Sequence, residues 1–182
     1  MRGDGDGWTY GPDGSRHWGL YGAAGLLLRA PLPNGRPAVL LQHRAIWSHH
    51  GGTWALPGGA RDSHESAVHA AVREAEEEAG IGYEAIRVRG ERVTAEIPGW
   101  TYTTVVADIH ETVTTRKNPE SRELRWVPED EVGERKLHPA FKESWPQLQT
   151  VPMRLADLDL DIEDPLPLTV QLPDAGFAWL SP

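Results

Sequence analysis

Three glutamates stand at positions that a helix would bring to one face. Glu74, Glu77 and Glu78 are spaced i, i+3 and i+4, so their side chains would be neighbours on a helical surface. Like charges at this spacing repel one another, and acids near the C-terminal end of a helix oppose its dipole. A solvated acidic face is the ordinary interpretation of such a pattern. A hard divalent cation such as Mg²⁺ or Mn²⁺ would make this cluster of acids favourable, because such an ion prefers clustered carboxylate oxygens.

The helix that would carry these acids is predicted from the residues around them. Asp62 and Ser63 are candidate N-caps, and Gly80 is suited to end the helix in the left-handed conformation. Glu65 precedes Arg73 by roughly two helical turns, so an acid and a base share the helix with the three glutamates. Small apolar side chains supply the opposite face, namely Ala67, Ala70, Ala71, Val72 and Ala75.

These positions together resemble the Nudix box, whose pattern is G-x5-E-x7-R-E-U-x-E-E-x-G-U with U aliphatic. The pattern is filled in register by Gly59, Glu65, Arg73, Glu74, Glu77, Glu78, Gly80 and Ile81. One departure is Ala75, where a larger aliphatic residue is usual, and it concerns core packing rather than chemistry. The flanking segments TWALPGG and LRWVPEDEV are also similar to this superfamily, most of all to actinobacterial MutT-type proteins.

The resemblance implies a metal-dependent hydrolase of a nucleoside diphosphate linked to another moiety. It implies that Glu74, Glu77 and Glu78 bind Mg²⁺ or Mn²⁺ and that a backbone carbonyl of Gly58 or Gly59 completes the ligand set. Such an ion neutralises phosphate charge and lowers the pKa of water. Glu74 is also a candidate for orienting or deprotonating the attacking water.

Other acidic and basic residues are expected to support these ligands. Glu65 and Arg73 are predicted to orient the metal-binding carboxylates, a role compatible with an ordinary helix salt bridge. Family members often recruit a further acid from a distant loop. Glu120 is the favoured candidate, ahead of Glu123 and Glu111, because it lies in the predicted loop rather than in the following strand.

Substrate contacts are predicted at one arginine and three aromatic residues. Arg44 follows a strand at the edge of the expected site, and its guanidinium suits bidentate binding of phosphate oxygens, although a plain surface role is equally open. Trp47, Trp100 and Tyr102 are candidates for stacking on a nucleobase. For any single one of them, packing in the fold is the alternative interpretation.

Two adjacent histidines, His49 and His50, lie in a glycine-rich loop. Neighbouring side chains do not converge on one ion in regular structure, so we expect no metal site at this pair.

The apolar pattern predicts an α+β fold, which the resemblance narrows to the α/β/α sandwich of the Nudix fold with a mixed sheet. A hairpin of residues 21–28 and 38–42 is followed by a strand at 54–56 and a turn at 57–59. Further strands are predicted at 85–97, 100–109 and 124–127. After the box helix, further helices are predicted to open at Pro128 and to span 138–148, where Pro146 predicts a kink or an early end.

Composition divides the chain into three parts. Residues 1–18 are rich in Gly and Asp and predict a mobile arm or an irregular edge. Residues 19–150 form the predicted Nudix hydrolase domain. Residues 151–182 hold many Pro, Asp and Leu residues, and they predict an extended tail that packs against the domain or a second subunit.

Charge and composition narrow the class of partner. The net charge of −9 disfavours a surface for duplex nucleic acid, although metal ions allow an acidic enzyme to hold nucleotides. The chain has no cysteine, which excludes disulfides and thiolate chemistry. No signal peptide or membrane span is recognisable, so we expect a cytoplasmic protein, either a monomer or a homodimer.

Three functions fit these observations. The first is a MutT-like pyrophosphatase that cleaves oxidised guanine nucleotides such as 8-oxo-dGTP to the monophosphate and pyrophosphate. The second is a pyrophosphatase of ADP-ribose or dinucleotides. It is weakly disfavoured because family members that act on ADP-ribose have a proline at a set distance after the box, and Pro98 lies somewhat beyond that distance. The third is a nucleotide-sensing, non-catalytic binding module, which would have no need of every acid in the box.

Overall fold

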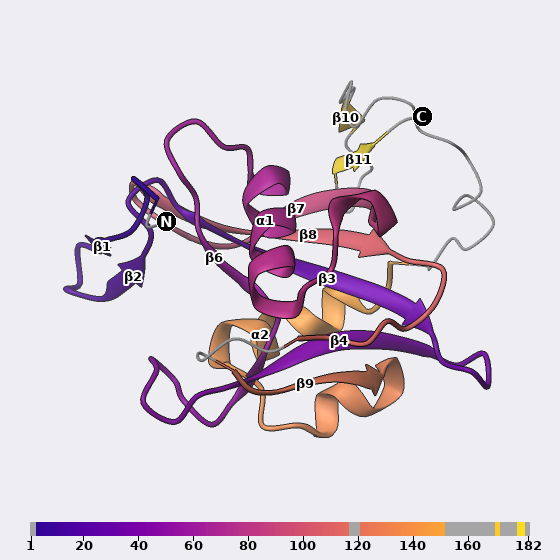
Figure 1. Cartoon of the computed structure of the whole chain (residues 1–182). Coiled ribbons are helices and arrows are strands. Elements are labelled where there is room, and N and C mark those ends of the chain that lie inside the picture. The colour runs from indigo at the N-terminus through magenta and orange to yellow at the C-terminus, as the bar shows by residue number, and fades with distance from the viewer. Residues whose placement is uncertain (1–2, 117–120, 152–169, 172–177, 181–182) are drawn as a thin grey trace.

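The computed structural model describes residues 3–116, 121–151, 170–171 and 178–180, and it centres on one nine-stranded sheet (Figure 1). The strands are β3 (Ala23–Pro31), β4 (Pro37–Arg44), β5 (Trp54–Ala55), β6 (Gly58–Ala60), β7 (Arg87–Ile97), β8 (Trp100–Asp108), β9 (Ser121–Pro128), β10 (Val170–Gln171) and β11 (Ala178–Leu180). Their order is β10-β11-β7-β8-β3-β4-β5, while β6 also pairs with β3 and β9 with β4. Because β3 and β8 are parallel and β3 and β4 are antiparallel, the sheet is mixed, as predicted.

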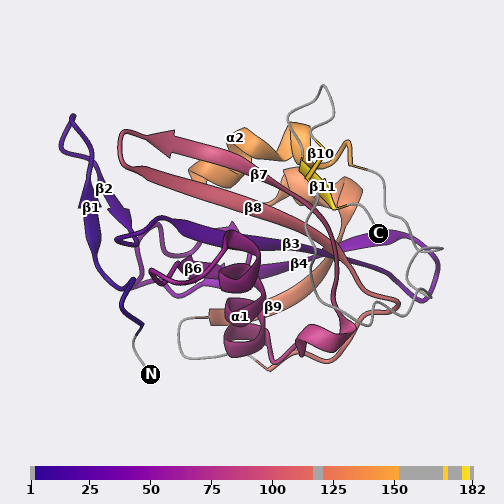
Figure 2. The same ribbon diagram turned by 90° about the horizontal axis from the view of Figure 1, so that it is seen from above.

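Two α-helices cover opposite faces of this sheet, α1 (Ala67–Ala79) and α2 (Pro139–Leu148) (Figure 2). The alternation of side chains along β3 explains the layers. Leu26 and Leu28 pack in the core cluster that includes the alanines of α1, whereas Leu27 packs in the cluster that includes Phe141 and Trp145 of α2. The α+β class and the α/β/α sandwich are therefore confirmed.

The box helix starts later than the sequence pattern suggests. Its N-cap is Ser66, whose hydroxyl accepts a hydrogen bond from the amide of His69, so the N-cap prediction at Asp62 and Ser63 is wrong. Those two residues instead bind the N-terminal segment, since Asp62 accepts a hydrogen bond from the Gly5 amide. The predicted stop is confirmed, because Gly80 has a φ of 71° and its amide bonds back to the last helical turn.

Two other local predictions also need correction. The expected turn at residues 57–59 is largely the strand β6, which pairs antiparallel with β3. Helix α2 continues past Pro146 to Leu148, and so it does not end at the proline. The described residues also form two short 3₁₀ helices, Tyr83–Ala85 and Glu129–Glu134, the second at the place where Pro128 predicted a helix.

The first segment of the chain holds a small hairpin of β1 (Trp8–Tyr10) and β2 (Arg16–Trp18), where composition predicted no regular structure (Figure 1). Aromatic contacts attach it to the domain. The Trp100 indole donates a hydrogen bond to the carbonyl of Trp18, and the His17 ring lies 4.6 Å from that of Trp100. Tertiary packing rather than local propensity therefore orders this segment.

In the described part of the last segment, β11 pairs with the outer strand β7, so this part of the predicted tail contacts the domain. Among the described residues, no helix combines the length and the apolar character needed to cross a membrane.

Candidate active site

Two glycines of β6 face the acidic residues of α1 at very short range. A Cβ atom added at Gly59 would lie 2.4 Å from Oε1 of Glu74. A Cβ atom added at Gly58 would lie 2.4 Å from the carbonyl oxygen of Ala24 on β3. A side chain at Gly59 would displace the end of the Glu74 side chain, and a side chain at Gly58 would clash with the backbone of β3. The glycine pair therefore lets the strand pass between β3 and the box carboxylates.

Glu78 is a buried carboxylate held on both oxygens. Its Oε2 accepts a hydrogen bond from the Gly58 amide at 2.8 Å, and its Oε1 accepts one from the Gln42 side-chain amide at 2.8 Å. Gln42 is buried and also donates to the Ser121 hydroxyl at 2.8 Å. These two bonds, one on each oxygen, fix the orientation of the carboxylate.

Sequence reasoning missed Gln42, although a signal was present. Gln42 follows the apolar run Ala38–Leu41 of the same strand. A buried amide needs hydrogen-bond partners, so a polar residue at the end of a buried strand indicates a polar site nearby.

Arg73 connects the acids of the site to one another. It donates to Glu65 at 2.7 and 3.0 Å, to Oε1 of Glu74 at 2.7 Å and to the carbonyl of Ala60 at 2.9 Å. The hydrogen bonds from Arg73 are the main cause that lowers the pKa of Glu65, against the opposing effect of burial. The same bond to Glu65 is the main cause that raises the pKa of Arg73, so both groups are charged at neutral pH.

Glu77 is the most open of the three box glutamates. Its side chain is 58% exposed and lies 3.6 Å from Arg73. Glu74, by contrast, is 15% exposed in its side chain and lies next to Gly59. Glu74 and Glu78 thus lie against β6, and these oxygen donors, with Glu77 on the same helix, are the type that suits a divalent cation such as Mg²⁺. Their roles as ligands stay predictions.

Tyr102 is the aromatic candidate nearest to the acids. A Cβ atom on Gly25 would lie 2.0 Å from its hydroxyl oxygen, so the phenol passes directly over β3. Burial, followed by the charge of Glu78, raises the pKa of Tyr102. The charge of Arg44 acts in the opposite direction and lowers the pKa of this phenol. The Arg44 side chain donates a hydrogen bond to the carbonyl of His49 at 3.1 Å.

The two tryptophan candidates lie in contrasting environments. Trp47 is 72% exposed, which leaves its ring free of a packing role in the domain. Trp100 is 8% exposed, and its indole is bonded to the N-terminal hairpin, so packing is the better explanation for Trp100.

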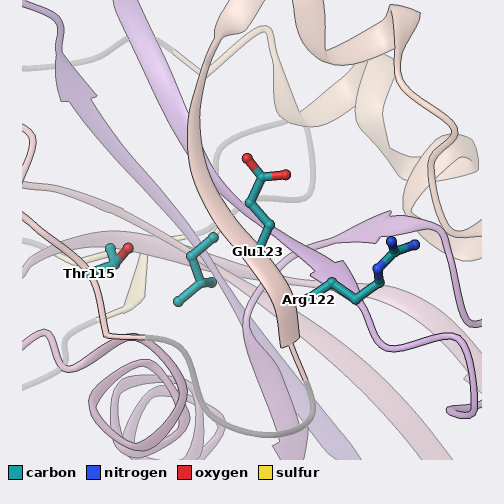
Figure 3. A pocket seen from close by; sticks show the side chains of 4 residues that line it. Thr115, Arg122 and Glu123 are labelled. Atoms are coloured by element: carbon teal, nitrogen blue, oxygen red, sulfur yellow. The ribbon is translucent and has the colours of Figure 1, made fainter.

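The acids predicted to join the box from elsewhere in the chain stay predictions. Glu120 lies outside the described residues. Glu123 accepts a hydrogen bond from Arg125 at 2.7 Å, and it lines a hollow with Thr115, Arg122 and Leu124 (Figure 3). Arg122 and Glu123 are neighbours on β9, and their side chains extend in different directions (Figure 3). Glu111 is exposed.

A family model described as NUDIX domain matches residues 23–149. The chain belongs to the Nudix family. This Nudix chain is 56% identical over 189 residues to the Mycobacterium tuberculosis protein named "Putative 8-oxo-dGTP diphosphatase 3", with 100% of this chain and 87% of the relative covered. A Bifidobacterium longum nucleoside triphosphate pyrophosphatase/Nudix hydrolase fusion protein is 45% identical over 148 residues, which are 79% of this chain and 30% of the fusion.

A solved structure gives the same result. The Nudix hydrolase RenU from M. smegmatis is 57% identical and superposes with a TM-score of 0.79, covering 82% of this chain and 99% of that one. The predicted family, fold and hydrolase class are therefore confirmed for this Nudix chain. Nudix hydrolases generally need divalent metal ions.

Proposed function

We propose that this Nudix hydrolase acts on oxidised guanine nucleotides, with 8-oxo-dGTP converted to the nucleoside monophosphate and pyrophosphate. The observation that carries the proposal is the set of box carboxylates around the Gly58–Gly59 strand, complete in a chain that is 56% identical to the mycobacterial relative across its whole length. The name of that relative supplies the substrate, and the geometry supplies a site suited to the chemistry.

The cofactor we propose is Mg²⁺, with Mn²⁺ as a substitute. Glu74, Glu77 and Glu78 would hold it, and the carbonyl of Gly58 or Gly59 would complete the set. When bound, the ion would neutralise phosphate charge and acidify the attacking water.

The residues of the chain prepare this site before substrate arrives. Gln42 and the Gly58 amide fix Glu78, so its remaining lone pairs have a defined direction. Arg73 holds Glu74 against Gly59 and is itself anchored by Glu65. Fixed carboxylates need little reorganisation when charge develops, which favours the transition state. Glu74 is our candidate for orienting the attacking water or accepting its proton.

Binding of the substrate is assigned to residues at the border of this site. Arg44 lies at the end of β4 and would contact phosphate oxygens. Tyr102 and the exposed ring of Trp47 are the candidates for contacts to the nucleoside. A cytoplasmic location and a monomeric or homodimeric state complete the proposal.

A substrate panel tests the proposal. Canonical nucleoside triphosphates, 8-oxo-dGTP, ADP-ribose, NADH and dinucleoside polyphosphates would be incubated with Mg²⁺, and phosphate and pyrophosphate would be measured separately. We expect pyrophosphate from 8-oxo-dGTP at low substrate concentration, with a higher kcat/KM than for dGTP. Activity on ADP-ribose or dinucleotides alone would contradict the proposed substrate, and tight binding without any turnover would point to a nucleotide sensor.

A further inference from the structure

Three histidine side chains gather on the surface beside β5. They are His49 and His50 of the β4–β5 loop and His138, which directly precedes α2. One ring nitrogen from each lies within 4.8 Å of those from the other two. The ring centroids of His49 and His50 are 4.1 Å apart, and those of His50 and His138 are 4.6 Å apart.

The backbone explains why adjacent histidines can converge here, contrary to the expectation for regular structure. His50 has a φ of 55°, the left-handed conformation that residues with a side chain rarely adopt. The turn is held in place because the His50 carbonyl accepts a hydrogen bond from the Thr53 hydroxyl at 2.6 Å. The Gly51 amide bonds to the carbonyl of Ser48 at 2.8 Å, which closes the turn from the other side.

Hydrogen bonds to β5 hold the third histidine, His138, beside the loop. The amide of His138 donates to the carbonyl of Trp54, and the amide of Trp54 donates to the carbonyl of Lys136, both at 2.8 Å. These bonds fix the segment before α2 against the strand that follows the histidine loop. Two segments far apart in the sequence are thus held together by the sheet itself.

We propose that His49, His50 and His138 form a binding site for a borderline transition-metal ion, with Zn²⁺ as the reference case. Imidazole nitrogens suit Zn²⁺ rather than Mg²⁺, and three of them leave a further position for water or an anion. A Zn–N bond is about 2.0–2.1 Å, so the three rings would turn toward one ion on binding. The site therefore differs in chemistry from the all-oxygen box.

The side-chain chemistry of the cluster suits a metal ion, because an imidazole nitrogen binds a borderline cation through its lone pair. Arg44 opposes the added charge of the ion, and its bond to the His49 carbonyl keeps it next to the loop.

Zinc binding by the full chain, without any histidine tag, tests the proposal. Calorimetric titration with Zn²⁺ in excess Mg²⁺ keeps the box carboxylates out of the measurement. We expect one strong site per chain in the wild type and at least about a tenfold rise in Kd for His138→Gln and His50→Gln. His69→Gln is the matched control, because His69 is exposed on α1 and away from this cluster, and it should bind as the wild type does.

Two results would overturn the site. One is no zinc binding by the wild type at micromolar concentrations, and the other is unchanged affinity in both variants. Because His50 is exposed, its variant keeps the test valid even if His138→Gln does not fold. The visible spectrum of a Co²⁺-loaded sample adds a readout independent of catalysis, since the bands of nitrogen-bound Co²⁺ should be lost in the same two variants.

Discussion

At the level of single residues, the ion pair of Arg73 with Glu65 makes stability depend on pH. The Arg73 hydrogen bonds lower the pKa of Glu65 below its ordinary value of 4.5. A depressed pKa in the folded state adds stability that is complete above the unfolded pKa and is lost as the pH falls through the folded pKa. We expect Glu65→Gln to be less stable than the wild type at neutral pH, with the difference shrinking below about pH 4.5.

Urea unfolding of both proteins from about pH 7 down to about pH 3 measures this difference. Glu143→Gln is the control, because Glu143 is exposed on α2, and its curve should follow that of the wild type at each pH. A gap between Glu65→Gln and the wild type that stays constant over the whole range would show that Glu65 does not carry the effect.

The sequence predicted the box residues better than it predicted their surroundings. The spacing of the glutamates and the arginine depends on one helix, and a helix places i, i+3 and i+4 together without help from the rest of the fold. Gln42 was missed because its bond to Glu78 joins two elements that are distant in sequence. The sequence predicts no metal site at His49 and His50, because the left-handed φ of His50 is not evident from its residue type.

At the level of elements, the two glycines of β6 have different roles. Gly58 allows close packing against β3, whereas Gly59 positions the Glu74 carboxylate. In Gly59→Ala, the new methyl group meets the end of the Glu74 side chain, which can move away. We expect near wild-type stability and a kcat reduced by about tenfold to a hundredfold, because a displaced catalytic group costs rate even when the fold is intact.

The neighbouring variant is the comparison. In Gly58→Ala, the methyl group meets the backbone of β3, at Ala24 and Gly25, which cannot move away without disturbing the sheet. We expect a loss of about 1–3 kcal/mol in the free energy of unfolding together with lost activity. Melting temperatures and kcat of Gly58→Ala and Gly59→Ala test these two roles. Equal losses of stability in both variants would contradict the different roles of the two glycines.

The elements themselves were largely predictable, and their ends were not. The strands with long apolar or β-branched runs lie where the pattern placed them, since burial on the sheet dictates such runs. The two glycines of β6 predict a turn because glycine is typical of loops, and only pairing with β3 makes them a strand. Helix α1 starts at Ala67 with Ser66 as its N-cap, because Asp62 and Ser63 bind the N-terminal segment instead of capping the helix.

At the level of the whole molecule, a buried charge network joins three strands. Asp108 on β8 bonds to Arg29 of β3 at 2.9 Å and to Arg89 of β7 at 3.0 Å. The side chains of Asp108 and Arg29 are 0% exposed, and Arg29 also bonds to the carbonyl of Val151 after α2. Removing one partner leaves a buried charge uncompensated, so we expect Asp108→Asn to destabilise the protein by about 3–5 kcal/mol.

Urea unfolding of Asp108→Asn is best compared with that of Asp130→Asn. Asp130 also pairs with an arginine, Arg36, but its side chain is 73% exposed, and such surface pairs contribute about 0–1 kcal/mol. A similar small loss in both variants would contradict the role given to the buried network.

The layered architecture could be predicted from the apolar pattern and the Nudix box, but the structure at the two ends of the chain could not. The hairpin β1–β2 rests on Trp100, and β11 pairs with β7, so both depend on long-range contacts. Composition alone describes these segments as Gly-rich and Pro-rich, which says nothing of the surface that receives them.

We propose that the box carboxylates make this chain a Mg²⁺-dependent pyrophosphatase of oxidised guanine nucleotides. The most direct measurement is pyrophosphate release from 8-oxo-dGTP as Mg²⁺ is titrated, for the wild type, Glu77→Gln and Glu76→Gln. Both glutamates are exposed on α1, but only Glu77 belongs to the box.

We expect Glu77→Gln to lower kcat by at least about a hundredfold, about 2.7 kcal/mol in the barrier, and to raise the Mg²⁺ concentration needed for half-maximal rate. Glu76→Gln should match the wild type, and melting temperatures should agree for all three. Turnover of Glu77→Gln within a few-fold of the wild type, at the same Mg²⁺ requirement, would contradict the account.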